Sequence, residues 1–414
     1  MAQTLETFGP IYLAETDYFK EGFPHDLFTK LRAENPVVWS EEKNDRGFWV
    51  LTKYKDIEYV SRNPQLFSSA TKNGGHRIFD EDKVGLVAAG EDNATIGRPM
   101  ISLDPPEHVG VRQSAMRGLT PAAMKSMEGR IRERISALLD AVVPGQQFDV
   151  ISSLSAPIPI QTLVEILGCP PEMEAELYAW TNCLVGEGDP EFRQSPEHMG
   201  KVIENLVKFA LQLLDAGKDG DGTDMISLIS KTYDGTKLSQ ADFLGNFILL
   251  VIGGNETTRN TLSGGLLAFA EYPDQLSKLI ANPELIPSAV KEILRWVSPV
   301  MHFRRTATED VEIRGVKIAK GSKIVMWYPS ANRDEEIWER PFEFDIERKN
   351  NRHFTFGTGQ HMCIGNRLGE LQIRVFLEEF TKRFNHVELA GKAKRVQSNF
   401  LQGLKKLPMK FNNV

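Results

Sequence analysis

The sequence has few cysteines and no long apolar run. Its 414 residues contain three cysteines, Cys169, Cys183 and Cys363. A low, odd count in a long chain does not suit a framework of structural disulfides and fits a reducing compartment. The strongest apolar run, 247–252, is far shorter than the roughly 20 residues that cross a bilayer. The first seven residues have neither a basic start nor an apolar core, so we expect no signal peptide, no membrane anchor and a cytoplasmic protein.

The chain also lacks an excess of positive charge. Lys and Arg number 49 against 56 Asp and Glu, which gives a net charge of −7. This balance argues against nucleic acid or an anionic membrane as the main partner. No low-complexity tract, no internal repeat and no linker rich in Pro, Gly or Ser divides the sequence, and the apolar fraction of 41% is enough for a large core. We therefore expect a single large domain over residues 1–414.

The periodicity of apolar residues indicates a mainly α protein with a small β portion. Ser239-x-x-Asp242 has the pattern of a helix capping box, and no proline follows it until Pro273. A long central helix over about 239–270 would run on the order of 45 Å. The glycine-rich, charged segment 71–98 is expected to be a long functional loop. Helices are also expected across 107–235, at 286–296 and at 367–383, and strands at 37–39, 48–52, 311–318 and 323–327.

The segment Phe356-Gly-Thr-Gly-Gln-His-Met-Cys-Ile-Gly365 holds Cys363 in a loop just before an expected helix. Glycines are needed where a backbone turns sharply or comes close to a flat ligand. Loop N–H groups and a helix N-terminus near the sulfur favour a thiolate, and a bound iron would deprotonate the thiol outright. The ordinary alternative is a buried cysteine that acts as a small hydrophobic residue.

This segment resembles the haem-binding loop of the cytochrome P450 family, because Phe-Gly-x-Gly-x-His-x-Cys-x-Gly agrees at fixed positions. The resemblance implies the cytochrome P450 fold, haem b as the cofactor and Cys363 as its axial thiolate ligand. It also implies that Phe356, Gly357 and Gly365 shape the loop, 356–365, against the cofactor.

A second resemblance lies on the expected long helix, in Gly253-Gly254-Asn-Glu256-Thr257. Each interior glycine costs a helix about 1 kcal/mol against alanine, so the pair needs a reason. Thr257 lies on the same face as the glycines, which could open a groove there for a flat cofactor; close helix packing is the ordinary alternative. The stretch resembles the family's oxygen-activation motif, which implies that Glu256 is the acid and Thr257 the alcohol of a proton relay.

Two further groups of residues fit the resemblance. His108 and Arg112 are spaced i,i+4, and with Arg305 and His361 they match the donors that would bind the haem propionates. Glu292 and Arg295 are spaced i,i+3, which on its own would suggest a weak surface ion pair. In the family such a pair is buried and joined by a later arginine, so the resemblance implies a structural triad. Its third member would be Arg348.

The motifs at 253–260, 302–307 and 328–334 look most like those of the bacterial alkane and fatty-acid terminal hydroxylases. This implies hydroxylation of a linear alkyl chain, a medium-chain fatty acid or an alkane, at or near its terminal methyl group. The reaction would use O2 and electrons from a separate ferredoxin and its NAD(P)H-fed reductase, in a monomeric enzyme. Terpenoid or steroid hydroxylation, and a non-catalytic haem-thiolate protein that binds a gas or ligand, stay open as alternatives.

The resemblance also suggests where substrate and partner would bind. Met301, Phe303 and Leu401 are expected to contact the lipophilic substrate, and Arg77 or Lys83 could meet an anionic head group. We also expect a basic patch that binds the ferredoxin, on the helices that the sequence predicts beside Cys363. Its members would be Arg112, Arg117, Lys125, Arg367 and Arg374.

Overall fold

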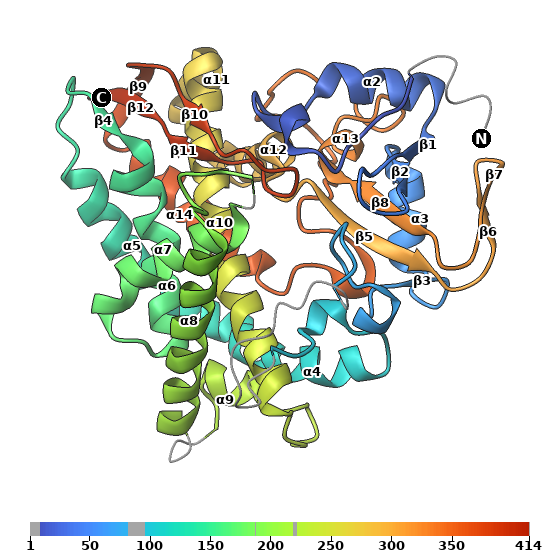
Figure 1. Cartoon of the computed structure of the whole chain (residues 1–414). Helices are drawn as coiled ribbons and strands as arrows, with labels where there is room; N and C mark the ends of the chain where they lie inside the picture. Colours follow the sequence, from blue (N-terminus) through green and yellow to red (C-terminus); the bar gives the residue numbers. More distant parts are fainter. Residues whose placement is uncertain (1–8, 82–95, 187, 218–221, 414) are drawn as a thin grey trace.

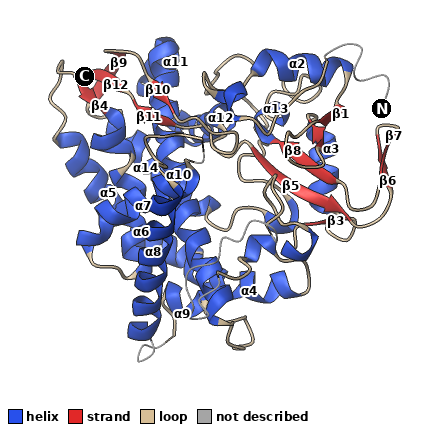
Figure 2. Ribbon diagram, in the orientation of Figure 1, coloured by secondary structure: helices blue, strands red, loops and turns tan. Residues whose placement is uncertain are grey.

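The computed structural model describes residues 9–81, 96–186, 188–217 and 222–413 (Figure 1). Most helices gather on one side of the molecule and most strands on the other, with α10 (Gln240–Glu271) running between them (Figures 1 and 2). The mainly α architecture with a small β portion is therefore confirmed. Within the described ranges, no helix is both long and apolar enough to cross a membrane.

The helices expected from periodicity are present with small shifts at their ends. Those before α10 are α2 (His25–Glu34), α3 (Tyr54–Arg62), α4 (Glu107–Met116), α5 (Pro121–Asp140), α6 (Pro157–Leu167), α7 (Glu174–Val185), α8 (Pro196–Ala216) and α9 (Met225–Ile229). Those after it are α11 (Pro273–Ala281), α12 (Ile286–Val297), α13 (Tyr328–Ala331) and α14 (Asn366–Phe380).

The long helix α10 begins and ends where the sequence predicts. The Ser239 hydroxyl accepts a hydrogen bond from the backbone N–H of Asp242 at 3.1 Å, which caps the first turn. The Asp242 carboxylate does not return to Ser239 as a full capping box would; it accepts bonds from the backbone N–H and the guanidinium of Arg98 at 2.8 and 3.3 Å. Thus the helix start is tied to a distant loop as well as capped.

The main sheet has five strands in the order β1-β2-β8-β5-β3. β1 (Val37–Ser40), β2 (Phe48–Leu51) and β8 (Lys323–Trp327) were expected, whereas β3 (Phe67–Ser68) and β5 (His302–Ala307) were not. The expected strand 311–318 is instead a hairpin of β6 (Val311–Ile313) and β7 (Val316–Ile318), turned at Arg314 and Gly315, which both have positive φ. The remaining strands are β4 (Phe148–Asp149), β9 (Phe384–Leu389), β10 (Lys394–Arg395), β11 (Leu404–Lys406) and β12 (Pro408–Asn413).

Two large apolar clusters pack against α10 and fix its position. One joins it to α5, α11, α12 and α14, and includes Leu262, Leu266 and Phe269. The other joins it to α6, α7 and α8, and includes Phe243, Phe247 and Val251. Since burial of each such side chain contributes about 1.5–3 kcal/mol, the helix is a rigid support for the residues at its centre.

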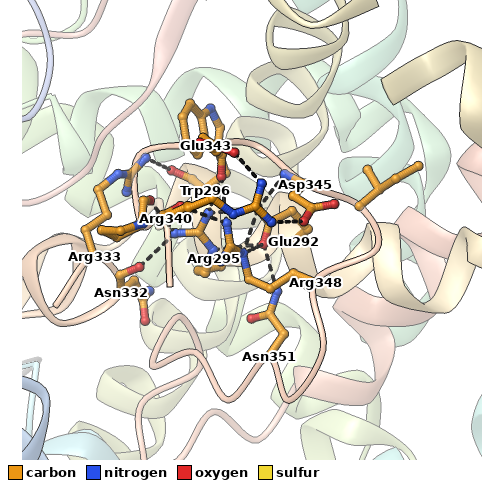
Figure 3. Close-up of polar contacts among 12 residues, drawn as sticks. Glu292, Arg295, Trp296, Asn332, Arg333, Arg340, Glu343, Asp345, Arg348 and Asn351 are labelled. Carbon is orange, nitrogen blue, oxygen red and sulfur yellow. Dashed lines mark hydrogen bonds and ion pairs between the residues drawn. The ribbon is translucent and has the colours of Figure 1, made fainter. Parts of the chain in front are cut away.

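Glu292, Arg295 and Arg348 form one buried cluster (Figure 3). The Glu292 carboxylate accepts two bonds from Arg295, at 2.7 and 2.8 Å, and two from Nε of Arg348, both at 3.2 Å. It also accepts from the backbone N–H of Asp345 and the amide of Asn351, both at 2.9 Å. These donors replace the water that the Glu292 carboxylate loses on burial. The same bonds join α12 to the segment before residue 356.

Candidate functional site

The Cys363 loop is shaped by backbone hydrogen bonds and glycines. The N–H of Cys363 donates to the carbonyl of Phe356, and that of Gly357 to Phe354, both at 2.8 Å. Gly357 and Gly359 have φ of 68° and 72°, a region that side chains disfavour. A Cβ at Gly359 would also collide with the backbone carbonyl of Ser61, so the loop lies directly against α3.

Cys363 differs from the other two cysteines. Its side chain is exposed, whereas Cys169 and Cys183 are buried. Although the side chain is exposed, the protein atoms packed around the sulfur raise the pKa of the Cys363 thiol, against the opposing effects of the Gly365 N–H and the Arg112 guanidinium. A metal ion at the sulfur would supply positive charge that favours the thiolate.

The four predicted propionate donors lie near one another beside this loop. The rings of His108 and His361 are 4.2 Å apart between centroids. Arg112 donates to the carbonyl of Met362 at 2.6 Å, and Arg305 to that of Arg304 at 2.7 Å. Burial, together with the charges of Arg112 and Arg305, lowers the pKa of His108 to about 4.

These donors lack acidic partners. Both ring nitrogens of His108 and Nε2 of His361 are buried without a hydrogen-bond partner. Within the described residues, no ion pair joins His108, Arg112, Arg305 or His361 to a carboxylate. Buried donors normally have partners, so this cluster fits a ligand with two carboxylates, and with Cys363 alongside it the residues fit a haem.

The two glycines of α10 have different surroundings. A Cβ at Gly253 would meet nothing within 4 Å, whereas one at Gly254 would lie 3.1 Å from Cδ1 of Leu163 on α6. Only Gly253 therefore opens a space, and Gly254 allows close packing of two helices. The hydroxyl of Thr257 donates to the carbonyl of Gly253 at 2.8 Å, on the open side.

Glu256 is held against α7. It is fully buried, forms an ion pair with Arg259 and accepts a hydrogen bond from Thr181 of α7 at 3.2 Å. Arg259 in turn donates to Asn182 of α7 at 2.7 Å. Burial raises the pKa of Glu256, against the opposing charge of Arg259. Sequence reasoning missed these partners, although Arg259 at i+3 was a visible signal.

An apolar cluster, here called the pocket wall, includes Ile252, the residue before Gly253 in α10. Three of its residues are only partly buried, and Phe303 and Phe400 have ring centroids 5.8 Å apart. Met301, expected to contact substrate, is not among them: it is buried with Trp327 in a different cluster. Its neighbour Val300, bridged to Leu401, belongs to the cluster instead. The pocket wall consists of Val185, Ile252, Val300, Phe303, Phe400 and Leu401.

The family model for cytochrome P450 matches residues 176–412 of the chain. This chain is a cytochrome P450. It is 46% identical over 396 residues to linalool 8-monooxygenase of Pseudomonas putida, covering 95% of this chain and 97% of the relative. It is 35% identical over 394 residues to a methyl-branched lipid omega-hydroxylase of Mycobacterium tuberculosis, covering 92% and 90%. A Mycobacterium marinum cytochrome P450 solved with pseudoionone has a TM-score of 0.86 at 29% identity, covering 97% and 98%.

The family assignment establishes a haem-thiolate monooxygenase with a lipophilic substrate, O2 and redox partners. A haem held by a thiolate supplies oxygen activation, since the sulfur pushes electron density onto the iron. A non-catalytic haem-thiolate protein, the alternative left open by the sequence, is therefore not favoured.

A polar cluster missed by sequence reasoning lies beside the pocket wall of this P450. Nδ1 of His76 is 2.6 Å from Glu81 and 2.7 Å from the hydroxyl of Ser102, which donates to Glu81 at 2.8 Å. Burial alone would raise the pKa of Glu81, but His76 and Ser102 lower it to about 2. The His76 ring lies 5.5 Å from Phe303, so this cluster fixes one side of the site.

Proposed function

We propose that this cytochrome P450 hydroxylates a terminal methyl group on a branched, isoprenoid-type chain. The pocket wall is the observation that carries the proposal, because all of its side chains are apolar and one of them, Ile252, is the neighbour of Gly253 in α10. A terminal C–H bond is the strongest on an alkyl chain, so selectivity must come from the position in which the chain is held. Phe303 and Leu401, on β5 and before β11, would hold the chain end there.

The relatives support a branched chain end over the linear chain expected from sequence. Position 8 of linalool and the omega position of a methyl-branched lipid are both chain-end carbons. Pseudoionone, bound in the M. marinum structure, is an acyclic isoprenoid. A branched end is wider than a linear one, and the ring contact of Phe303 with Phe400 provides a broad apolar face for it.

One observation keeps a fatty acid as second candidate. The Arg77 guanidinium lies 3.7 Å from the ring centroid of Phe400, so a cation is present at the edge of the pocket wall. A fatty-acid carboxylate could pair with it while the chain follows the apolar residues. Lys83, the other basic residue expected to meet a head group, lies outside the described residues.

The roles of the site residues are part of the same proposal. Cys363 would be the thiolate ligand of the haem iron, in the loop shaped by Phe356, Gly357 and Gly365. The propionates would accept bonds from His108 and His361, whose buried nitrogens lack partners, and from the neighbouring guanidinium groups of Arg112 and Arg305. Thr257 would position a proton on the open side of α10, and Glu256 would have to leave Arg259 to take part.

Electrons would come from a ferredoxin that docks near the Cys363 loop of a monomer. Three exposed apolar side chains, Val109, Met116 and Met362, lie on α4 and this loop, and exposed Arg117 and Arg367 are near in sequence. Arg374, expected in the same patch, is instead paired with Glu128 and Glu378 at 2.8 and 2.6 Å and is neutralised. The proposed surface is therefore apolar at its centre with cations around it: Arg112, Arg117, Lys125 and Arg367.

The test is turnover with a ferredoxin, its reductase and NADH, followed by mass spectrometry of the products. Linalool, dodecanoic acid, octane and testosterone are offered separately. We expect linalool to be hydroxylated at a chain-end methyl; turnover of the steroid alone would overturn the proposal. Phe303→Leu should shift the position of attack, whereas the matched control Met301→Leu, in the separate buried cluster, should not.

A further inference from the structure

Arg333, in the turn after α13, is a buried cation without an acidic partner. It is 3% exposed, and its Nη2 donates to the carbonyl of Trp296 at 2.9 Å. Its Nε and Nη1 are also buried but have no hydrogen-bond partner among the described residues, and no ion pair there joins Arg333 to a carboxylate. Arginine stays charged in proteins, and a buried charge is costly unless a group of opposite charge compensates it.

The carboxylate that acts most strongly on Arg333 already belongs to other cations. Glu292 is that carboxylate, and it accepts bonds from Arg295 and Arg348. Figure 3 shows the guanidinium of Arg333 beside this cluster, with its contact directed to Trp296 and not to Glu292. Burial and the charge of Arg295 hold the pKa of Arg333 well below its usual value, against the attraction of Glu292. Positive charge is therefore in excess at this place.

His25, at the start of α2, contributes a further donor without a partner. Its Nδ1 is buried and has no hydrogen-bond partner among the described residues. Burial, followed by the charge of Arg333, lowers the pKa of His25 well below 6.5, so the ring is neutral near pH 7. Because Arg333 exerts the largest charge effect on His25, the two side chains lie near each other. A neutral imidazole with its proton on Nδ1 is a donor, so both side chains offer N–H groups and neither offers an acceptor.

The surroundings of these donors favour a small anion. The guanidinium of Arg333 lies 4.6 Å from the ring centroid of Trp296, and the His25 ring packs edge-on against Phe342 at 6.0 Å. Phe342 is 42% exposed, so the donors lie beneath a side chain at the surface. A large oxyanion would turn several acceptor atoms toward aromatic rings, where they would lose water without gaining donors. A monatomic halide needs only the N–H groups that are present.

The residue before Arg333 supports the Cys363 loop. Oδ1 of Asn332 accepts a hydrogen bond from the backbone N–H of Phe354 at 2.7 Å. The carbonyl of Phe354 in turn accepts from the N–H of Gly357 at 2.8 Å, at the beginning of the loop. A change in the position of Arg333 would therefore reach the loop through two consecutive hydrogen bonds.

We propose that Arg333 and His25 bind one chloride ion, which stabilises the segment supporting the Cys363 loop and thereby slows the loss of haem. The ion would accept from Nε and Nη1 of Arg333 and from Nδ1 of His25. Water would also accept these bonds, but it brings no negative charge, and a charge is what the buried guanidinium lacks. The inference does not depend on which substrate is oxidised, and haem serves only as the readout.

The test measures transfer of haem to apomyoglobin, followed by Soret absorbance, after dialysis of the haem-loaded protein into sodium chloride or sodium gluconate of equal ionic strength. An ion that binds only the closed form stabilises it by the factor 1 + [ion]/Kd, so chloride at about ten times its Kd should slow the transfer about tenfold. Arg333→Met should transfer haem at the same rate in both salts. The matched control Arg340→Met, at a side chain that is 55% exposed, should keep the chloride effect. Equal rates in both salts for the wild type would overturn the proposal.

A second measurement locates the ion. In crystals of the haem-loaded protein soaked in sodium bromide, an anomalous difference peak is expected within hydrogen-bond distance of Nε or Nη1 of Arg333. Peaks confined to the surface would mean an adventitious ion only and would exclude the site. If Arg333→Met does not retain haem, His25→Phe removes the other donor and should weaken the chloride effect. A chloride effect of wild-type size in His25→Phe would also contradict the proposal. Failure of linalool turnover leaves all these results unaffected, because no substrate is present.

Discussion

The hydroxyl of Thr257 donates to the carbonyl of Gly253, 2.8 Å away and one turn earlier in α10, on the side where a Cβ would meet nothing. Thr261 makes the same bond to the carbonyl of Thr257, also at 2.8 Å, but its side chain is buried. Two threonines thus have the same local bonding and differ in whether they face open space. The pair allows a role in chemistry to be separated from a role in helix structure.

Thr257→Ala should divert electrons from product to hydrogen peroxide while substrate affinity is retained. General acid–base assistance is worth roughly 10²–10⁴-fold, although water partly replaces a lost hydroxyl. The ratio of product to NADH consumed, measured with peroxide formation, gives the result. Thr261→Ala should keep the wild-type ratio, and full coupling in Thr257→Ala would remove Thr257 from the relay.

Cys363→Ser should abolish the strongly red-shifted Soret band of the reduced carbon monoxide complex. That band needs a thiolate trans to the ligand, and the hydroxyl of serine does not replace it. The controls are Cys169→Ser and Cys183→Ala, at buried positions away from the loop. The folded fraction of each control variant should keep the band. Persistence of the band in Cys363→Ser would show that another residue binds the iron.

Arg348→Met should destabilise the protein by about 3–5 kcal/mol, because it leaves the buried Glu292 carboxylate short of a cation. The matched control is Arg340→Met, which removes an exposed cation that pairs with Glu343 at 2.6 Å and with Asp345 at 3.3 Å (Figure 3). An exposed pair contributes about 0–1 kcal/mol at most. Denaturant unfolding of both variants gives the comparison, and equal losses would contradict a structural role for the triad.

The parts of the fold that were predictable from the sequence depend on local signals. The start of α10 follows from a capping serine, and its end from Pro273, so both could be predicted without tertiary contacts. β5 was missed because two of its six residues are arginines that look exposed in sequence. Arg304 is in fact buried against Asp80 at 2.6 Å, a partner more than two hundred residues earlier.

The site residues also divide into those predicted by local sequence signals and those placed by distant contacts. The Cys363 loop and the proximity of His108, Arg112, Arg305 and His361 were predictable from motifs at fixed spacings. Their binding of the haem propionates stays a prediction. Met301 was predicted to contact substrate, but its side chain is buried with Trp327, whereas that of its neighbour Val300 packs with Phe303 in the pocket wall. These residues precede β5, so no regular period in the sequence predicts which of the two side chains joins which cluster. The position of Glu256 depends on Thr181 and Asn182 of α7, whose proximity no spacing in the sequence reveals.

His302 is 1% exposed, and neither of its ring nitrogens has a hydrogen-bond partner. Burial lowers its pKa well below 6.5, and the charge of Arg77 lowers it further. Near pH 6.5, the His302 imidazole therefore binds a proton in the unfolded chain but not in the folded chain. The free energy of unfolding should be unaffected at high pH and should fall as the pH drops below 6.5.

Replacement of this imidazole by a ring that cannot titrate should flatten the pH dependence. Below pH 6.5, the free energy of unfolding of His302→Phe should fall less steeply with pH than that of the wild type. The two slopes should differ by up to about 1.4 kcal/mol per pH unit, which corresponds to the uptake of one proton. Denaturant unfolding at pH 5 and pH 8 measures the difference. His386→Phe, at an exposed position on β9, should leave the dependence unchanged. Identical slopes for the wild type and His302→Phe would mean that water or another donor satisfies His302 in the folded protein.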